Sequence, residues 1–241
     1  MMEAIKERVS SYWTVRSADF AKLREEELES EPAGLWLSEI EPQLPLGRKL
    51  RILDVGTGSG YFSVLLAGKG HQVTGIDLTP AMIEEAKKLA AEHQTEAEFL
   101  VMDAENLEFA DESFGAVVSR NLTWTLPHPE RAYQEWLRVL KPGGVLLNFD
   151  ADYGLERFSC EKGLPENHAH RQMSGSQLEE CDAIKDQLFI SQERRPAWDL
   201  ELLKELGCSQ AQADTRVSER VYRKESSYYN PTPLFRVRAV K

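Results

Sequence analysis

The stretch LDVGTGSGYF, residues 53–62, constrains the fold of this chain more than any other feature. It joins an apolar run typical of a buried strand to a second apolar run typical of a helix, through Gly56, Gly58 and Gly60. Because glycine has no Cβ, a turn of this composition lets the backbone approach a ligand closely. In open α/β sheets, ligands bind at the carboxyl ends of the strands, where the strand order reverses. The motif therefore predicts a nucleoside-binding site directly after a first strand.

Alternating strand and helix patterns continue through residues 49–153. The expected strands, rich in Val, Ile and Leu, are 50–55, 71–78, 97–104, 115–121 and 145–152. Between them, 79–93 is a helix with Thr79 as N-cap and Pro80 at its first position, and 128–144 is a helix that ends at KPGG. This alternation, with right-handed crossovers, predicts a Rossmann-like, doubly wound α/β sheet.

The remaining segments are expected to complete a seven-stranded, mostly parallel sheet whose last strand is antiparallel. Residues 1–48 have helical periodicity and predict an N-terminal helical cap before an α/β domain at 49–241. Residues 154–197 carry few apolar residues and one expected helix, 176–189, so they predict a lid insertion after the fifth strand. A helix at 197–207 and an antiparallel pair, 211–222 and 232–241, are expected to close the domain.

Composition and charge limit the classes of binding partner that we expect. The chain of 241 residues has 40 acidic and 29 basic side chains and a net charge of −11, which argues against nucleic acid as the main partner. Cys160, Cys181 and Cys208 lie far apart and do not suggest a disulfide framework. The sequence begins without a signal pattern, and no apolar run approaches the roughly 18 residues of a membrane span. We expect a cytoplasmic protein with no membrane partner.

Two classes of nucleoside cofactor suit a glycine turn in this position. The dinucleotide fingerprint is G-x-G-x-x-G, whose third glycine packs the following helix. Here the spacing is G-x-G-x-G, and Tyr61 stands where that third glycine is expected. The departure disfavours an NAD-dependent oxidoreductase, which remains an alternative.

Four motifs then resemble, in order and spacing, those of the class I S-adenosylmethionine-dependent methyltransferases. They are LDVGTGSGYF, VTGIDLTPAMIEEAKK, FLVMDAENLEFADESFGAVVSRNLTW and PERAYQEWLRVLKPGGVLL. The resemblance covers roughly residues 35–150 and is greatest to the small-molecule, quinone-biosynthesis-like branch with a type 11 methyltransferase domain. The sequence departs from the pattern at Gly115, where aspartate is usual, and at NLTWTLPHP.

The resemblance implies a set of cofactor contacts. Asp77, at the end of the second strand, accepts the ribose hydroxyls, as acidic residues do in dinucleotide folds. Leu78 lies against the adenine, Asp103 and Ala104 meet its amino group, and Asn121 meets the methionine moiety. Asp54 either organises the glycine turn or faces the amino-acid end. The full expected set is Asp54, Gly56, Thr57, Gly58, Gly60, Asp77, Leu78, Met82, Asp103, Ala104 and Asn121.

Most of these residues also have a structural interpretation. Asp77 suits a helix N-terminus and Leu78 an ordinary core position. Asp103 suits the start of a turn before AEN, and Asn121 the end of a strand.

The methyl acceptor is expected over the ends of the fourth and fifth strands. Arg120 suits a substrate carboxylate there, although an arginine in such a place more often pairs with a nearby acid. Trp124 suits a pocket wall or the core, and Tyr12 and Arg16 of the opening helix are expected to fold over the site. No catalytic residue is identified; His128 is the one candidate base.

The lid sequence CEKGLPENHAHRQMSGSQLEEC contains Cys160, His168, His170 and Cys181. Their spacing matches no standard zinc pattern, so no metal is expected. The basic and imidazole groups of the lid suggest a polar or anionic small substrate.

The expected function is transfer of a methyl group from S-adenosylmethionine to a small molecule by in-line displacement, with S-adenosylhomocysteine as product. A monomer or homodimer is expected. Besides the oxidoreductase, a non-catalytic S-adenosylmethionine-binding protein remains an alternative. An RNA or protein methyltransferase is disfavoured by the acidic charge and by RNLTW, which stands where NPPY or DPPY is typical.

Overall fold

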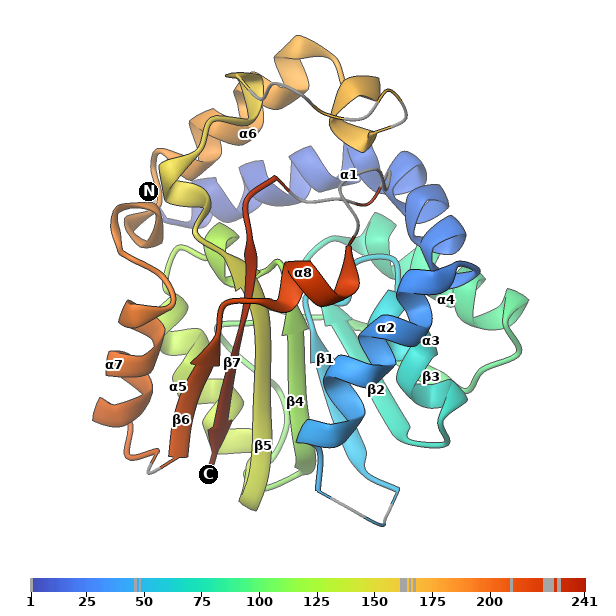
Figure 1. Ribbon diagram of the computed structural model, residues 1–241, viewed down its shortest axis with the longest axis vertical. Helices are drawn as coiled ribbons and strands as arrows, with labels where there is room; N and C mark the ends of the chain where they lie inside the picture. The colour runs from blue at the N-terminus through green and yellow to red at the C-terminus, as the bar shows by residue number, and fades with distance from the viewer. Residues whose placement is uncertain are drawn as a thin grey trace.

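A central mixed sheet organises the molecule (Figure 1). The computed structural model describes residues 2–45, 47, 49–160, 164, 166, 168–208, 210–222, 228 and 231–241. These residues form a seven-stranded sheet in the order β3-β2-β1-β4-β5-β7-β6. The strands are β1 Arg51–Val55, β2 Gln72–Asp77, β3 Ala97–Val101, β4 Phe114–Arg120, β5 Leu140–Ala151, β6 Gln210–Asp214 and β7 Leu234–Val240. Strands β1 to β5 pair in parallel, and β7 is antiparallel to both β5 and β6, which confirms the expected fold class.

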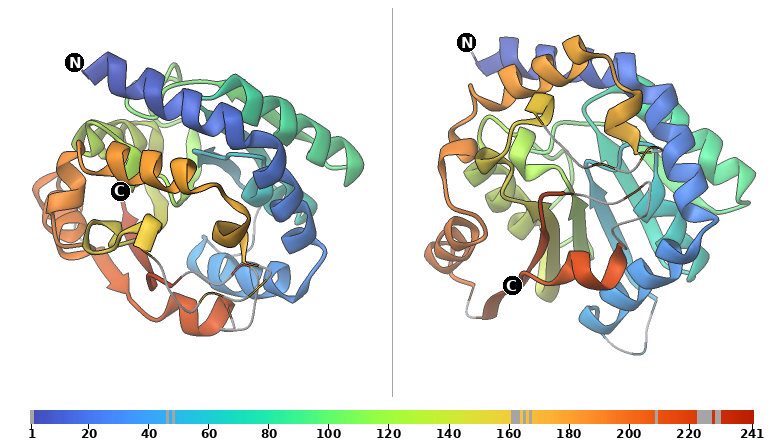
Figure 2. Two further views of the ribbon diagram at one scale, coloured as in Figure 1. Left: turned by 90° about the horizontal axis from the view of Figure 1, so that it is seen from above. Right: turned by 45° about the horizontal axis from the view of Figure 1, so that its top comes forward.

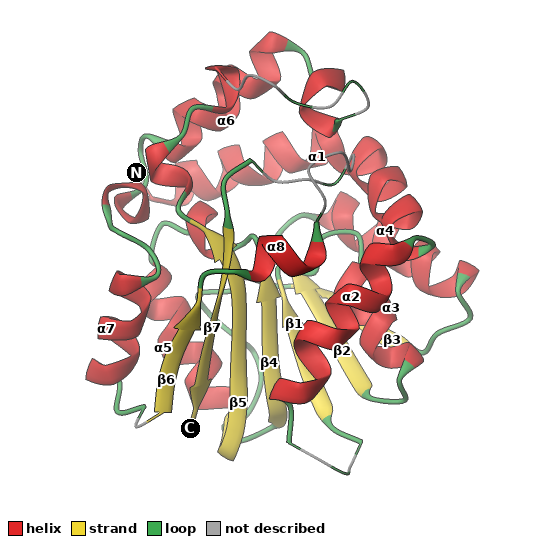
Figure 3. Ribbon diagram, in the orientation of Figure 1, coloured by secondary structure: helices red, strands yellow, loops and turns green. Residues whose placement is uncertain are grey.

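Helices cover both faces of the sheet (Figure 3). They are α2 Glu31–Ile40, α3 Tyr61–Gly68, α4 Pro80–Glu92, α5 Pro129–Val139 and α7 Ala197–Glu205. Because successive side chains of a strand point to opposite faces, β1 contributes to two cores. Ile52 packs in the cluster that contains residues of α2 and α3, and Leu53 packs in the cluster with α5 and α7.

The N-terminal helix α1, Met2–Leu28, crosses the carboxyl ends of the parallel strands (Figures 1 and 2). Helix α6, Gly175–Lys185, lies over it and contacts it. Arg8 of α1 binds Glu180 of α6 in a bidentate pair, with nitrogen–oxygen distances of 2.5 and 2.7 Å. The helical cap and the lid together cover the edge of the sheet at which ligands of α/β folds bind.

The largest departures from the expected elements are at 211–222 and at the end of the helix expected at 128–144. The stretch 211–222 is not a strand throughout: β6 ends at Asp214 and a short helix, α8 Val217–Val221, follows. Val217 and Val221 are both buried, and their spacing of four fits one face of a helix as well as one face of a strand. Helix α5 ends at Val139, and β5 begins at Leu140, because Leu140 already pairs with Phe114.

The described part of 154–197 contains α6 and short 3₁₀ helices and no strand. The expected helix 176–189 is realised as α6, which begins with a capping box between Ser174 and Gln177. Residues 161–163, 165 and 167 of the expected lid lie outside the described residues. Among the described helices, none combines the length and apolar character needed to cross a membrane.

Candidate functional site

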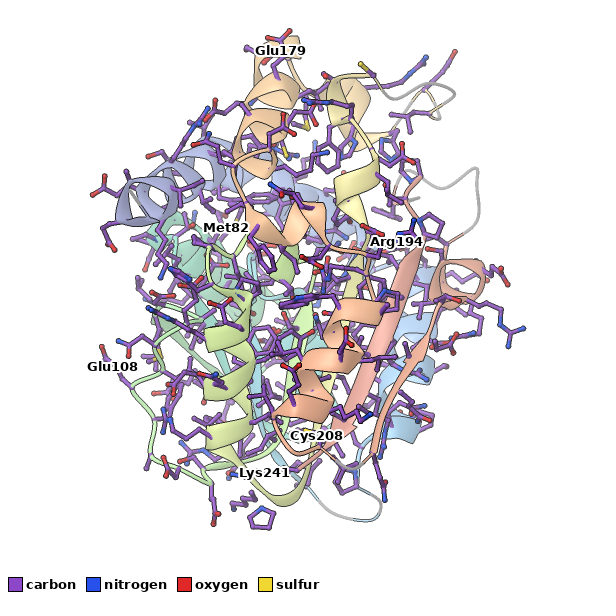
Figure 4. The ribbon with its side chains drawn as sticks, turned by 90° about the vertical axis from the view of Figure 1, so that its left-hand side faces the viewer. Met82, Glu108, Glu179, Arg194, Cys208 and Lys241 are labelled. Carbon is purple, nitrogen blue, oxygen red and sulfur yellow. The ribbon has the colours of Figure 1, made fainter. Side chains whose placement is uncertain are left out.

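A cavity lies between the carboxyl ends of the parallel strands, helix α1 and the lid. The expected cofactor residues that line it are Asp54, Gly56, Thr57, Gly58, Asp77, Leu78, Met82, Asp103, Ala104 and Asn121. The four expected acceptor residues, Tyr12, Arg16, Arg120 and Trp124, line it as well. Figure 4 shows Met82 between Glu179 of α6 at the top of the molecule and Lys241 near the bottom. The fold therefore brings residues from distant parts of the sequence to one cavity.

The glycine turn has the geometry that only glycine adopts easily. Gly56 has φ +68°, and a Cβ there would lie 2.8 Å from the side chain of Leu122. Gly60 has φ +87° at the N-cap of α3, and its Cβ would lie 3.0 Å from the Cβ of Ala86. Gly60 is not among the described residues that line the cavity, so its role here is the close packing of α3 on α4.

Asp54 organises the glycine turn. Its Oδ2 accepts hydrogen bonds from Thr57 Oγ1 at 2.6 Å and from Ser63 Oγ at 2.8 Å. Burial raises the pKa of this carboxyl to about 6, although the two hydroxyl donors oppose the shift. Of the two roles that the sequence left open, the hydrogen bonds support the structural one.

The raised pKa of Asp54 predicts a pH-dependent stability that Asp54→Asn removes. Below pH about 4 the Asp54 carboxyl is protonated in both the folded and the unfolded chain. Between pH about 4 and about 6 the folded chain keeps a proton that the unfolded chain has released. Wild-type stability therefore falls as pH rises through this window, by about 3 kcal/mol at roughly 1.4 kcal/mol per pKa unit. In urea unfolding, the stability of Asp54→Asn relative to wild type should rise by that amount from pH about 4 to 7. A pH-independent difference would contradict the assignment.

Asp77 connects the glycine turn to the start of α4. Its Oδ2 accepts the backbone N–H of Gly58 at 3.0 Å, and its Oδ1 accepts that of Thr79 at 2.9 Å. Each carboxylate oxygen keeps acceptor capacity for a further donor. Burial raises the pKa of Asp77, against the effect of the two amides. The side chain is thus held at the cavity wall by two backbone amides, with acceptor capacity left on both oxygens.

Asp103 begins the turn that the sequence suggested. It also forms an ion pair, which the sequence did not indicate. Its Oδ1 accepts the backbone N–H of Glu105 at 2.9 Å. Lys6 Nζ lies 2.6 Å from Asp103 Oδ2 and 2.5 Å from Glu105 Oε2, so α1 is attached to the chain after β3. The carbonyl of Ala104 accepts a hydrogen bond from Trp136 Nε1 at 3.1 Å.

Asn121 has φ +55°, in the left-handed region that asparagine tolerates better than most residues. Its Oδ1 accepts a hydrogen bond from Tyr153 OH at 3.2 Å, and its backbone carbonyl accepts one from Trp124 Nε1 at 2.9 Å. Asn121 thereby orients two aromatic residues of the cavity wall, besides ending β4.

Arg120 pairs with an acid, the alternative that its sequence context left open. Its Nη2 lies 3.0 and 3.2 Å from the two carboxylate oxygens of Glu27 in α1, and it also donates to Tyr222 OH. The guanidinium lies 4.5 Å from the ring centroid of Trp36 and 4.9 Å from that of Tyr61. Glu27 is 93 residues away in the sequence, so no local pattern indicated this pair.

Glu27 faces two arginines. Arg24 also contacts its carboxylate, so the fully buried Glu27 balances one of two positive charges. Burial opposes ionisation, yet the charges of Arg120 and Arg24 lower the pKa of Glu27. Arg120 Nη1 and Arg24 Nε are buried and have no hydrogen-bond partner among the described residues. Both arginines line the cavity, and this wall therefore carries an excess positive charge.

His128 lies at the start of α5. It is the N-cap of α5, its backbone N–H donates to Glu105 Oε1 at 2.6 Å, and its Nδ1 lies 3.1 Å from Glu130 Oε1. It is not among the described residues that line the cavity. This position does not support a role as the base.

The histidines and cysteines of the lid do not gather into a metal centre in the part of the chain that the structure describes. His168, His170 and Cys181 line the cavity, and Cys160 is exposed. Burial raises the pKa of Cys181 to about 11, so this thiol is protonated at neutral pH.

Comparisons with known proteins agree with this geometry. A family model described as a methyltransferase domain matches residues 53–148. The putative methyltransferase YqeM of Bacillus subtilis is 37% identical over 132 residues, which are 53% of this chain and 52% of that protein. The ubiquinone biosynthesis O-methyltransferase of Coxiella burnetii is 34% identical over 111 residues, 46% of this chain and 47% of that protein. The chain thus matches about half the length of these curated relatives.

Solved structures show the same fold over most of the chain. A putative methyltransferase of Haloferax volcanii, in complex with the Trm112 methyltransferase activator, has a TM-score of 0.61, 22% identity and coverage of 95% of this chain and 96% of that one. An S-adenosylmethionine-dependent methyltransferase of Aquifex aeolicus has a TM-score of 0.56, 20% identity and coverage of 89% and 92%. Residues 53–148 thus match a methyltransferase domain, and the solved structures show that the fold extends over most of the chain.

Proposed function

We propose that this protein transfers a methyl group from S-adenosylmethionine to a small molecule. The observation that carries the proposal is Asp77, held by the amides of Gly58 and Thr79 on the wall of a cavity that the glycine turn opens. A carboxylate with spare acceptor capacity at the end of a second parallel strand suits the two hydroxyls of a ribose. The domain family of residues 53–148 supports the same cofactor.

The cavity lining suggests how the cofactor lies. The ribose would bind Asp77, and the adenine would lie between Leu78 and Met82 with its amino group toward Asp103 and Ala104. The wall that contains Arg24 and Arg120 has an excess positive charge. A carboxylate such as that of the methionine moiety would balance this charge.

Methyl transfer from a sulfonium needs alignment more than it needs a catalytic group. The acceptor atom attacks the methyl carbon in line with the breaking C–S bond, whose electron pair remains on sulfur. Proposed acceptors are small molecules rather than nucleic acids, because the net charge of −11 opposes binding of a phosphate backbone. The chain is proposed to act as a monomer or homodimer.

Calorimetric titration with S-adenosylhomocysteine and, separately, with NAD tests the cofactor. We expect micromolar affinity for the first and no measurable binding of the second. Binding of NAD alone would replace the proposal with the oxidoreductase alternative. Binding of S-adenosylhomocysteine without turnover of any acceptor in a broad panel would favour a non-catalytic cofactor-binding protein.

A further inference from the structure

The half of the cavity beyond the ends of β4 and β5 has a different chemistry from the half at the glycine turn. We call it the acceptor chamber and define it by Tyr12, Arg16, Trp124, Tyr153 and Phe158, all of which line the cavity. Its residues come from α1, from the turn after β4 and from the chain that leads from the end of β5 into the lid.

One wall of the acceptor chamber is a block of three aromatic rings. The ring centroid of Trp124 lies 4.9 Å from that of Tyr153 and 5.6 Å from that of Phe158, and the last two are 5.5 Å apart. The backbone N–H of Trp124 donates to Asp150 Oδ2 at 3.1 Å and its Nε1 to the carbonyl of Asn121. A buried aromatic wall fixed in this way favours a flat, apolar ligand.

The part of the acceptor chamber that α1 contributes carries a positive charge. The Arg16 guanidinium lies 5.7 Å from the ring centroid of Tyr12 and 5.4 Å from that of Trp13, and its Nη1 donates to Tyr12 OH at 3.2 Å. Among the described residues, no carboxylate pairs with Arg16. Stacking holds the guanidinium in place while most of its five N–H donors remain available.

The carboxylates of the cavity lie elsewhere. In the described lining they are Asp54 within β1, Asp77 at the end of β2 and Asp103 after β3. Each of them already accepts hydrogen bonds from the protein. The acceptor chamber therefore combines one guanidinium with no carboxylate among its described lining residues, although the chain as a whole has a net charge of −11.

Aromatic walls alone would also suit a cationic ligand such as a quaternary amine. Arg16 favours an anionic ligand over a cationic one. A second positive charge beside the guanidinium in a partly desolvated chamber is unfavourable, whereas a carboxylate can bind the planar guanidinium through two parallel hydrogen bonds. The lining thus favours a ligand that is flat and negatively charged.

Building on the proposed function, we propose that the methyl acceptor is an aromatic or similarly conjugated carboxylic acid. Its ring packs against Trp124, Tyr153 and Phe158, and its carboxylate binds Arg16. In the reaction, a nucleophilic atom of the acceptor bonds to the methyl carbon as the C–S bond breaks. The electron pair of that bond stays on sulfur as S-adenosylhomocysteine, and any proton that the acceptor atom loses passes to water. Arg16 acts as the specificity residue.

The test compares carboxylates with their neutral amides. Benzoate, cinnamate, 2-naphthoate and indole-3-acetate, each beside its amide, are titrated calorimetrically into the chain saturated with S-adenosylhomocysteine. We expect at least one acid to bind more than about tenfold tighter than its amide, the gain of a charge-assisted hydrogen bond. Arg16→Gln should remove this preference and Arg16→Lys should restore part of it. Lys22→Gln, which removes a charge from an exposed position of the same helix, should leave the preference unchanged.

The inference is overturned if no acid of the panel binds, if amides bind as tightly as acids, or if Lys22→Gln lowers the preference as much as Arg16→Gln does. Thermal unfolding of Arg16→Gln establishes that the variant is folded. Failure of the wild type to bind S-adenosylhomocysteine would instead contradict the proposed function. The same acid–amide comparison on the chain without cofactor then still decides whether Arg16 makes a carboxylate site.

Discussion

Asp77→Ala is expected to weaken binding of S-adenosylhomocysteine by more than about a hundredfold. The wild-type carboxylate has both oxygens oriented by backbone amides, and we propose that it accepts both ribose hydroxyls. Hydrogen bonds to a charged group contribute roughly 1.5–3 kcal/mol each, so the loss of two is worth at least about 3 kcal/mol, or more than a hundredfold in the dissociation constant. Calorimetry on the purified variant measures the effect directly.

A second variant tests whether Asp77 contacts the cofactor directly or only shapes the glycine turn. Asp77→Asn keeps one acceptor oxygen, so it should support either Gly58 or Thr79 and bind the cofactor with intermediate affinity. Glu84→Gln, on the exposed surface of α4, serves as the charge control and should bind normally. Wild-type affinity in a folded Asp77→Ala would show that the ribose is not at this carboxylate.

The alternation of strands and helices and the position of the cavity could be predicted because they depend on local patterns. Gly56 and Gly60 occupy backbone conformations with positive φ, and the motif around them identifies the turn. Thr79 and Pro80 mark the start of α4 at the position observed. These signals arise within a few residues of one another, so they are visible before any tertiary contact is known.

The partners of the charged site residues could not be predicted in the same way. Lys6 binds Asp103, and Glu27 binds Arg120, across 97 and 93 residues. Which of many acids meets which cation depends on how α1 crosses the sheet, and the periodicity of α1 indicates only that a helix exists. Helix α8 was missed because Val217 and Val221, which are both buried, have a spacing of four that fits one face of a strand as well as one face of a helix.

The second large effect is a loss of stability, expected when a buried charge cluster beneath the lid is disrupted. Arg195 Nη1 lies 2.7 Å from Asp150 Oδ2, and its Nη2 and Nε lie 2.6 and 2.9 Å from the two oxygens of Asp199. These three side chains are at most 1% exposed. Tyr133 OH donates to Asp199 Oδ1 at 2.6 Å, so α5, β5 and α7 meet at this cluster. Arg195 thereby attaches the end of the lid to the sheet.

Arg195→Met is expected to lower the free energy of unfolding by about 3–5 kcal/mol, because it leaves two buried carboxylates without their cation. Arg194→Met removes the same charge from an exposed neighbour and should change stability by less than about 0.5 kcal/mol in urea unfolding.

The deficit of Arg195→Met should also depend on pH. Burial already raises the pKa of Asp150 although Arg195 opposes the shift, and removal of the arginine raises it further. A raised carboxyl pKa means that the folded state gains stability as protons bind, so the deficit relative to wild type should shrink as pH falls from 7 toward 5. Asp150 also accepts the backbone N–H of Trp124. The same variant should therefore loosen the aromatic wall of the acceptor chamber. The emission band of tryptophan fluorescence should then be broader when a carboxylic acid of the panel binds. A deficit that is constant with pH would mean that the lost contacts of the Arg195 side chain, rather than the unpaired carboxylates, set its size.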